Sequence, residues 1–399
     1  MEKMIQYIIE FLLYGDAEAA KLVGYTNEAD TAYKVIIRPN GHLGKDWVLP
    51  DLSTENVLSV QGSDNPKNGP IVITTDIVYN TAFFISRAEE LLNPQRDEHG
   101  RFLAKYSILG KDNRLLIPLI DEYSRVLMKA LGLPLPPPAF AAVNLTHDID
   151  TLTQYRHLRG ATGGVLRGHA KEVFAAWNDI NNDPAYTFGW LMKQDLRLVK
   201  RLPQTKMIYF VKDTPGKGYD YPQYNLNGKD FRHLAHCLTE HGAILGLHSS
   251  YYGNIKLSTG QPDGLSPLSP INYQLNRNHF LRCPIETMRA LAAAGITDDY
   301  TMGFADTAGF RLQTTRPVRW IDPLTYRLSP LTLHPLTIMD CTLQSEQYMN
   351  LNEEEAFYYC QQLIDKTKQH QGELTLLWHN TSIKTAYLGS LYKTLLDTI

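Results

Sequence analysis

The sequence has no surplus of charge of either sign, few cysteines and no long hydrophobic segment. Its 39 lysines and arginines and 42 aspartates and glutamates give a formal charge of −3, so nucleic acid is not an expected partner. The four cysteines are widely spaced without a CxxC pair, which indicates reduced thiols in a reducing compartment. No run of about 18 apolar residues occurs, so we expect no membrane span.

The N-terminal segment also lacks the features of a secretion signal. Its apolar part, Ile5–Tyr14, is short, is interrupted by Gln6 and Glu10, and is not followed by a small-residue cleavage site. We interpret it as the first amphipathic element of a folded domain and expect a cytoplasmic protein. A hydrophobic fraction of 43% with 10% aromatic residues indicates a folded chain with a large core.

A proline-rich segment, Pro134–Pro138, divides the sequence into two expected parts, because such a run is stiff and extended. Before it, the strand-like and helix-like stretches are residues 32–37, 70–74, 81–92 and 114–131. They predict a small α/β accessory domain over residues 1–133, joined through residues 134–138 to the rest of the chain.

After this joint, strand and helix patterns alternate, which is typical of a parallel sheet. Strands are expected at residues 140–145, 207–211, 243–247, 280–283 and 374–378. Helices are expected at residues 190–202, 231–241, 284–294, 352–368 and 386–398, with a capping box formed by Asn352 and Glu355. Residues 139–399 therefore predict a barrel-like α/β fold, with the loops 214–230 and 257–272 bordering a cleft.

Three of the strand-like runs end in residues that carry chemistry. The segment VNLTHDID ends in Asp148 and Asp150, AILGLHSSYY contains His248, and LTLLWHN contains His379. In α/β proteins, catalytic groups collect at the carboxyl ends of strands. Because side chains alternate along an extended strand, Asp148 and Asp150 are expected to point to the same side. The sequence thus predicts one site built from several strand ends.

The residue types in this expected site suit metal-assisted hydrolysis of an amide or ester. Asp150 and His248 offer a carboxylate and an imidazole, which bind Zn²⁺ and other divalent first-row metals. Asp148 would act as the base and His379 as the general acid. Arg282 would keep Asp148 ionised, because a neighbouring cation lowers the pKa of a carboxyl group. Taken singly, each residue also has a structural interpretation in a turn or in packing.

The order of the segments resembles a known family. THDID, GLHSSYY, FLRCP, DDYT and LLWHN are similar, in that order, to the five motifs of the NodB-homology polysaccharide deacetylases, or carbohydrate esterase family 4. NRNHFLR, DDYTMGFADTAGFR and LTLLWHN resemble the bacterial branch that has a T-H-D-V-D first motif and an N-terminal accessory domain. TTDIVYNTAFFISRAEELL and RDEHGRF resemble that accessory domain, so the likeness spans most of the chain.

The resemblance implies a distorted (β/α) barrel that removes an N- or O-acetyl group from a carbohydrate with a divalent metal, zinc first and cobalt, nickel or iron as alternatives. The resemblance implies the roles given above for four residues, Asp148, Asp150, His248 and His379. Arg282 would match the arginine that orients the base, and Asp299 the acid of the fourth motif.

One position departs from the family pattern. The second histidine of the metal-binding motif falls at position 252, where this sequence has Tyr252, and a phenol is a poor zinc ligand beside imidazole. His279, three residues before Arg282, is one candidate for the missing ligand. Water or Tyr252 itself would complete the metal shell in a second interpretation. In a third, tight metal binding and the activity are lost.

Three functions are compatible with the sequence. The first is a metal-dependent carbohydrate deacetylase. The second is a catalytically silent carbohydrate-binding protein on the same barrel, and the third is a C–N hydrolase that acts on a non-sugar amide. Bound metal separates the first from the second, and activity on acetylated sugars against small amides separates the first from the third.

Overall fold

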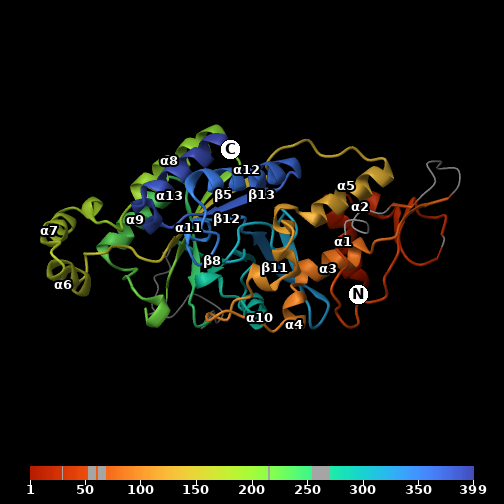
Figure 1. The fold of residues 1–399 in the computed structure, drawn as a ribbon, viewed down its shortest axis with the longest axis horizontal. Helices are drawn as coiled ribbons and strands as arrows, with labels where there is room; N and C mark the ends of the chain where they lie inside the picture. Colours follow the sequence, from red (N-terminus) through yellow and green to blue (C-terminus); the bar gives the residue numbers. More distant parts are fainter. Residues whose placement is uncertain (29, 53–59, 62–68, 214–215, 254–269) are drawn as a thin grey trace.

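The computed structural model describes residues 1–28, 30–52, 60–61, 69–213, 216–253 and 270–399. These residues form a mixed α/β structure with a four-stranded sheet in the N-terminal part and a nine-stranded sheet in the remainder. Figure 1 shows an elongated molecule, with the N-terminal part at one end and the helices α6 and α7 at the other.

The N-terminal part packs short helices around its small sheet. Strands β1 (Val23–Tyr25), β2 (Val35–Ile37) and β4 (Ile71–Ile73) are parallel, and β3 (Val60–Gln61) pairs antiparallel with β4. The helices are α1 (Glu2–Leu12), α2 (Ala17–Ala20), α3 (Ile77–Ser86), α4 (Glu89–Leu92) and α5 (Leu119–Leu131), and 3₁₀ turns lie at Ala104–Tyr106, Ile108–Gly110 and Arg114–Leu116. All four stretches expected before the proline-rich segment thus contain a strand or helix.

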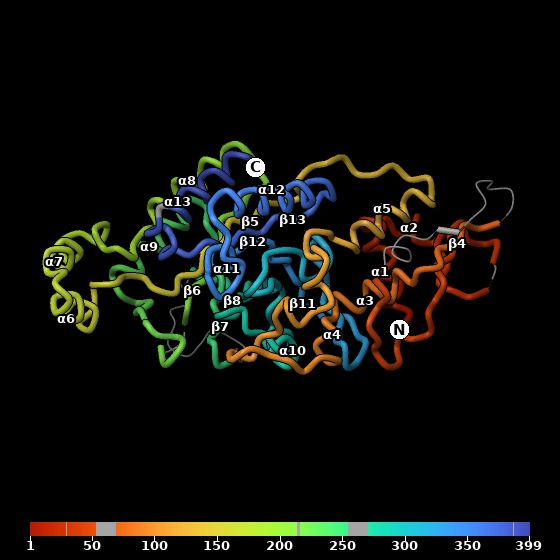
Figure 2. The backbone as a smooth tube through the Cα atoms, viewed as in Figure 1, coloured from red at the N-terminus to blue at the C-terminus, as the bar shows by residue number. Residues whose placement is uncertain are grey.

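Within the described residues, the larger sheet has the strand order β10-β11-β9-β8-β7-β6-β5-β13-β12, and it is curled (Figure 2). Its strands are β5 (Ala142–Ile149), β6 (Thr205–Val211), β7 (Ile244–Ser249), β8 (Ile271–Asn278), β9 (Asp298–Met302), β10 (Val318–Asp322), β11 (Arg327–Pro335), β12 (Ile338–Met339) and β13 (Glu373–Leu377). Neighbouring strands are parallel except β10 and β11. The continuous burial of β13 and most of β5 fits parallel strands that are covered on both faces.

Helices connect these strands and cover the sheet. They are α6 (Leu158–Leu166), α7 (Ala170–Asn178), α8 (Phe188–Arg201), α9 (Lys229–Glu240), α10 (Ile285–Ala293), α11 (Asp340–Gln344), α12 (Glu353–Gln369) and α13 (Ala386–Thr398), with 3₁₀ turns at Ile180–Asn182, Gly218–Asp220, His279–Leu281 and Asn380–Lys384. Residues of α8, α12 and α13 share one apolar cluster with β5 and β13. Among the described residues, no helix has both the length and the apolar character that crossing a membrane requires.

The N-terminal part shares its apolar core with the larger sheet. One cluster of buried side chains runs from α1, α3 and α5 into β10 and β11. Two buried carboxylates reinforce this contact. Glu90 accepts hydrogen bonds from Arg87 at 2.7 Å and from Arg311 at 2.8 Å, and Asp121 accepts one from Arg316 at 2.9 Å. The N-terminal part is therefore packed against the edge of the sheet that ends in β10.

Most elements expected after the proline-rich segment are present near their predicted bounds, and the capping box of Asn352 and Glu355 is confirmed. The strand expected at 280–283 is wrong. Strand β8 ends at Asn278, and the chain then makes a 3₁₀ turn in which Phe280 has a φ of 59°, which extended backbone does not allow. The patterns also leave five strands unpredicted, β8 to β12. Most of the loop expected at 257–272 lies outside the described residues.

Candidate active site

The carboxyl ends of neighbouring parallel strands bring the expected site residues together. Asp148 lies near the end of β5 and Asp150 directly after it, His248 is on β7, and His279 and His379 follow β8 and β13. These strands are neighbours in the order β13-β5-β6-β7-β8. Because parallel strands end at the same edge of a sheet, residues far apart in the sequence meet there.

Asp150, His248 and His279 form a group whose possible ligand atoms all lie within 4.8 Å of one another. Oδ1 of Asp150 is 3.3 Å from Nε2 of His248 and 3.2 Å from Nε2 of His279. Zinc–ligand bonds of about 2.0–2.2 Å place the ligand atoms of a tetrahedral site roughly 3.3–3.6 Å apart. The spacing of the three residues therefore fits a small divalent cation.

Both histidines are oriented by a hydrogen bond at the opposite side of the ring. Nδ1 of His248 lies 3.0 Å from the carbonyl oxygen of Arg277, and Nδ1 of His279 lies 2.9 Å from Oδ1 of Asp220. A ring that donates from Nδ1 presents the lone pair of Nε2, the form that binds metals. Among the described residues, Nε2 of His248 and Oδ1 of Asp150 are buried without a hydrogen-bond partner. Two unpartnered acceptors that face each other favour a cation between them.

Asp220 is held by further hydrogen bonds, which fix the orientation of His279. It accepts from the hydroxyl of Ser250 at 2.5 Å and from the backbone N–H of Tyr251 at 2.9 Å. Burial raises the pKa of Asp220, but the hydrogen bonds from His279 and Ser250 outweigh burial and lower the pKa to about 2. Asp220 is thus an ionised carboxylate behind a candidate metal-binding histidine.

Without a metal, the same group behaves as a set of ion pairs. Burial lowers the pKa of His279, but the neighbouring carboxylates of Asp150 and Asp220 outweigh burial and raise the pKa to about 9. Burial raises the pKa of Asp150, yet the two neighbouring histidines bring it well below the usual range of a carboxyl. A bound cation would replace the extra proton, because metal binding requires neutral imidazole and ionised carboxylate.

The arginine that contacts Asp148 is Arg277, and the expectation for Arg282 is corrected. Nη1 of Arg277, on β8, donates to Oδ1 of Asp148 at 3.1 Å, and both side chains are buried. Arg282 instead donates to the carbonyl oxygens of His99 and Tyr251, each at 2.9 Å. The 3₁₀ turn after β8 turns the chain away before Arg282, so its side chain reaches the rim of the site.

His379 lies beside the three-residue group and is paired with a buried aspartate. Its Nε2 is 3.7 Å from Oδ2 of Asp150, and its Nδ1 is 2.8 Å from Oδ1 of Asp340. Burial lowers the pKa of His379, but the charge of Asp340 outweighs burial and raises the pKa well above its ordinary value. Asp340, Cys341 and His379 form a second group with metal-binding atoms. The short bond to Asp340 occupies Nδ1 and leaves Nε2 facing Asp150.

Two expected residues lie outside this arrangement. Asp299 is fully buried on β9 and accepts hydrogen bonds from Asn276 and Thr301, each at 2.8 Å, and burial raises its pKa. No hydrogen bond within the described part of the chain joins it to His379. Tyr252 is half-exposed, with its hydroxyl 3.5 Å from the backbone N of Tyr219. The structure thus gives His279, rather than Tyr252, the place beside Asp150.

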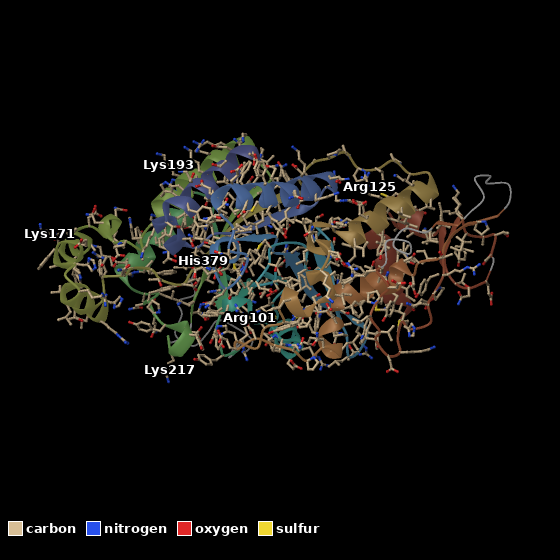
Figure 3. All side chains as sticks on the ribbon, in the orientation of Figure 1. Arg101, Arg125, Lys171, Lys193, Lys217 and His379 are labelled. Atoms are coloured by element: carbon tan, nitrogen blue, oxygen red, sulfur yellow. The ribbon has the colours of Figure 1, made fainter. Side chains whose placement is uncertain are left out.

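The N-terminal part also reaches the rim of this site. Nδ1 of His99 lies 3.2 Å from the hydroxyl of Tyr251, and Arg101 donates to the carbonyl oxygen of Phe280 at 3.2 Å. The rings of His99 and Phe280 are 4.9 Å apart between centroids. Figure 3 shows Arg101 and His379 in the middle of the molecule, away from Lys171 at its end. Residues of both parts of the chain therefore surround the candidate site.

Sequence reasoning missed three residues that matter here, Asp220, Arg277 and Asp340. Asp220 lies in the loop 214–230, which was expected only to border a cleft. Asp340 follows the short apolar strand β12, which repeats the signal of an apolar run that ends in a polar residue. Arg277 lies in the stretch NRNHFLR together with Arg282. The expected role beside Asp148 was given to Arg282, because its position resembles that of the motif arginine.

Residues 4–134 match a family of unknown function, DUF7033, which covers about a third of the chain. No curated protein matches the sequence. Similarity is found to the crystal structure of a protein from Mycobacterium smegmatis that is provisionally named a polysaccharide deacetylase, with 11% identity and a TM-score of 0.40 over 67% of this chain and 86% of that chain. An overlap this loose does not assign an activity.

Proposed function

We propose that the protein is a metal-dependent hydrolase that removes an N- or O-acetyl group from a carbohydrate. The observation that carries this proposal is the group of Asp150, His248 and His279, whose ligand atoms converge while two of them lack hydrogen-bond partners. Asp148 and His379 each lie within 4 Å of this group. The carbohydrate substrate is supported by the order of the motifs from THDID to LLWHN.

The residues around the group have complementary tasks in such a reaction. A divalent metal held by the three residues would act as a Lewis acid toward the acyl oxygen and the attacking water. Asp148 would accept a proton from that water at Oδ2, the oxygen that Arg277 leaves unengaged and that lies 3.6 Å from Nε2 of His248. His379 would donate the proton on Nε2 to the leaving amine or alcohol, because Asp340 holds its ring and favours its charged form.

We further propose that the curled sheet is a distorted (β/α) barrel over residues 139–399, joined through residues 134–138 to an accessory domain over residues 1–133. The packing of the N-terminal part against the β10 edge supports a role in completing the wall of this barrel. The four free cysteines support a reducing compartment, so the proposed location is the cytoplasm.

A second candidate is a catalytically silent carbohydrate-binding protein. It is favoured by the ion pairs that a protonated His279 makes with both Asp150 and Asp220, because these would close the site without a metal. A C–N hydrolase of a non-sugar amide would use the same residues as the deacetylase and differs from it only in the substrate.

Metal analysis and acetate release test these alternatives on the full-length protein. We expect about one equivalent of zinc, cobalt, nickel or iron per chain in chelator-free preparations, and loss of this metal in Asp150→Ala. Acetate release from acetylated sugars should stop on chelation and return when metal is restored. A folded protein that contains no metal and binds none when it is added would favour the silent binding protein. Hydrolysis of small amides without hydrolysis of acetylated sugars would favour the third function.

A further inference from the structure

The hairpin formed by α6 and α7 exposes large apolar side chains on its outer face. Among the described residues these are Leu158, Val165, Leu166, Phe174 and Trp177. Leu166 is 86% exposed, Leu158 81% and Phe174 69%. Helical spacing puts Leu158, Val165 and Leu166 on one side of α6, and Phe174 and Trp177 on one side of α7. A surface helix normally carries polar residues there, so this face is suited to contact a partner.

The inner face of the hairpin, in contrast, is closely packed, with small residues at the points of contact. Gly164 is buried against Val173 and Tyr155, and a Cβ atom at position 164 would lie 2.6 Å from a methyl of Val173. Ala176 is fully buried in the same contact. The close approach of the two helices leaves no room for large side chains between them. The buried contact consists of Tyr155, Val173 and Ala176, and the exposed apolar residues take no part in it.

The hairpin is fixed to the body of the protein at its base. Arg156 donates to the carbonyl oxygens of Ala176 and Trp177 and forms a two-pronged ion pair with Asp230. The indole N–H of Trp177 donates to the carbonyl oxygen of Tyr155 at 2.9 Å. Figures 1 and 2 show α6 and α7 standing out from the rest of the molecule. The apolar face is thus presented in a defined direction, away from the core.

Cationic side chains accompany the apolar face. Arg167 and Lys171 are exposed on the hairpin, and the guanidinium of Arg159 lies over the ring of Tyr221, 5.1 Å from its centroid. The carboxylates of the hairpin are Glu172 and, at the end of α7, Asp179. Figure 3 shows Lys171 at the extreme end of the molecule. The hairpin is therefore positively charged although the whole chain carries a formal charge of −3. Exposed leucine and aromatic residues together with lysine and arginine are typical of helices that lie in the interface of an anionic membrane.

We propose that the α6–α7 hairpin docks the protein onto the surface of a membrane that contains anionic lipids. Its apolar face would enter the boundary between headgroups and acyl chains, and Arg167 and Lys171 would contact lipid phosphates. This inference does not depend on the proposed reaction, because docking requires neither metal nor substrate. A second copy of the chain is the competing occupant of the same face.

Vesicle flotation with the full-length protein tests the proposal. We expect binding to vesicles of phosphatidylcholine and phosphatidylglycerol in equal parts, much weaker binding to pure phosphatidylcholine, and release at high salt. Leu166→Gln with Phe174→Gln should weaken binding about tenfold or more, because two apolar side chains are withdrawn from lipid. These positions are exposed, so the double variant should fold. Tyr358→Gln on α12, where the side chain is 60% exposed, is the control and should bind as the wild type does.

A separate readout locates the contact. In Phe174→Trp, the fluorescence of the added indole should shift to shorter wavelength when anionic vesicles are added, and in Tyr358→Trp it should not. Absence of binding, or equal binding by the double variant and the wild type, would overturn the proposal. A dimer in solution that the double variant dissociates, without binding to vesicles, would also overturn it and assign the face to a second copy.

Discussion

Nδ1 of His279 lies 2.9 Å from Oδ1 of Asp220, a residue that comes 59 positions earlier in the sequence. This contact turns the other ring nitrogen of His279 toward Asp150, at 3.2 Å. A carboxylate behind a metal-binding histidine fixes the ring and raises its basicity. The pair therefore supports His279 as the residue that supplies the imidazole missing at position 252.

Replacement of Asp220 should weaken metal binding without removing a ligand. For Asp220→Asn we expect affinity for zinc to fall about 10- to 100-fold, the usual effect of losing such a supporting carboxylate. Competition with a chromogenic chelator measures this affinity. Asp230→Asn, at the partly exposed ion pair with Arg156, is the control and should leave it unchanged. If Asp220→Asn bound zinc as tightly as Asp230→Asn, Asp220 would have no part in metal binding.

His279 and Tyr252 should respond differently to substitution. His279→Ala should lower metal affinity by orders of magnitude, because a ligand is lost from the metal shell. Tyr252→Phe should leave the affinity unchanged, because the hydroxyl of Tyr252 lies at Tyr219 rather than at Asp150. Metal content is measured in the folded fraction, so that loss of stability is not mistaken for loss of a ligand. Weaker binding in Tyr252→Phe alone would restore the phenol as the third ligand.

The sequence identifies the residues that meet at this sheet edge better than the residues that hydrogen-bond to them, for a physical reason. Asp148, Asp150, His248 and His379 stand at the ends of apolar strands, and such strands are recognisable from composition alone. Parallel pairing then brings their ends to one edge. Asp220 comes from a loop and Asp340 from a two-residue strand, neither of which has a periodic signal.

The misassigned arginine has a related cause. A strand was expected at residues 280–283, and the resemblance of FLRCP to the third family motif assigned Arg282 to the base. Phe280 and Leu281 have positive φ angles, which are incompatible with a strand. The sequence does not predict such angles, because phenylalanine and leucine normally avoid them. Strand β8 consists largely of polar residues. Asn276 and Arg277 can be buried there because their side chains form hydrogen bonds within the protein. A hydrophobicity pattern cannot reveal such a strand.

The proposed roles of Asp148 and His379 can be distinguished by the choice of substrate. Asp148→Asn should retain the metal and lose most turnover, because only the proton acceptor is removed. His379→Ala should lower the rate on an acetamide about 10²- to 10⁴-fold, the usual contribution of one general acid. On an activated acetate ester the loss should be much smaller, since that leaving group needs no proton. Equal losses on amide and ester would assign His379 a structural role instead.

Glu90 should be important for stability, because it is buried between Arg87 and Arg311 where the N-terminal part meets the larger sheet. Burial raises its pKa, but the two arginines outweigh burial and lower the pKa to about 2. Glu90→Ala would leave two buried cations without a carboxylate, which costs about 3–5 kcal/mol of unfolding free energy. Urea unfolding measures this change. Glu18→Ala, which breaks an exposed pair with Lys21, should have little effect.

His334 should make the stability of the protein fall at alkaline pH. It lies 2.9 Å from Asp298 and 2.6 Å from Glu373, and so connects β9, β11 and β13. Burial lowers the pKa of His334, but the hydrogen bonds to both carboxylates outweigh burial and raise the pKa to about 9. In the unfolded chain, the pKa of His334 returns to about 6.5. The folded protein therefore binds the proton more tightly, and protonation of His334 stabilises the fold.

This contribution is fully present below about pH 6.5 and is lost as the pH rises through about 9. The pKa difference corresponds to roughly 3 kcal/mol at most. In His334→Gln the unfolding free energy should be lower at pH 6 and should approach that of the wild type at pH 9.5. Urea unfolding across this range measures the difference. His236→Gln, at an exposed pair with Glu240, should keep the pH dependence of the wild type. A constant difference between His334→Gln and the wild type would mean that the histidine contributes through packing against Tyr300, whose ring lies 4.1 Å away between centroids, rather than through its charge.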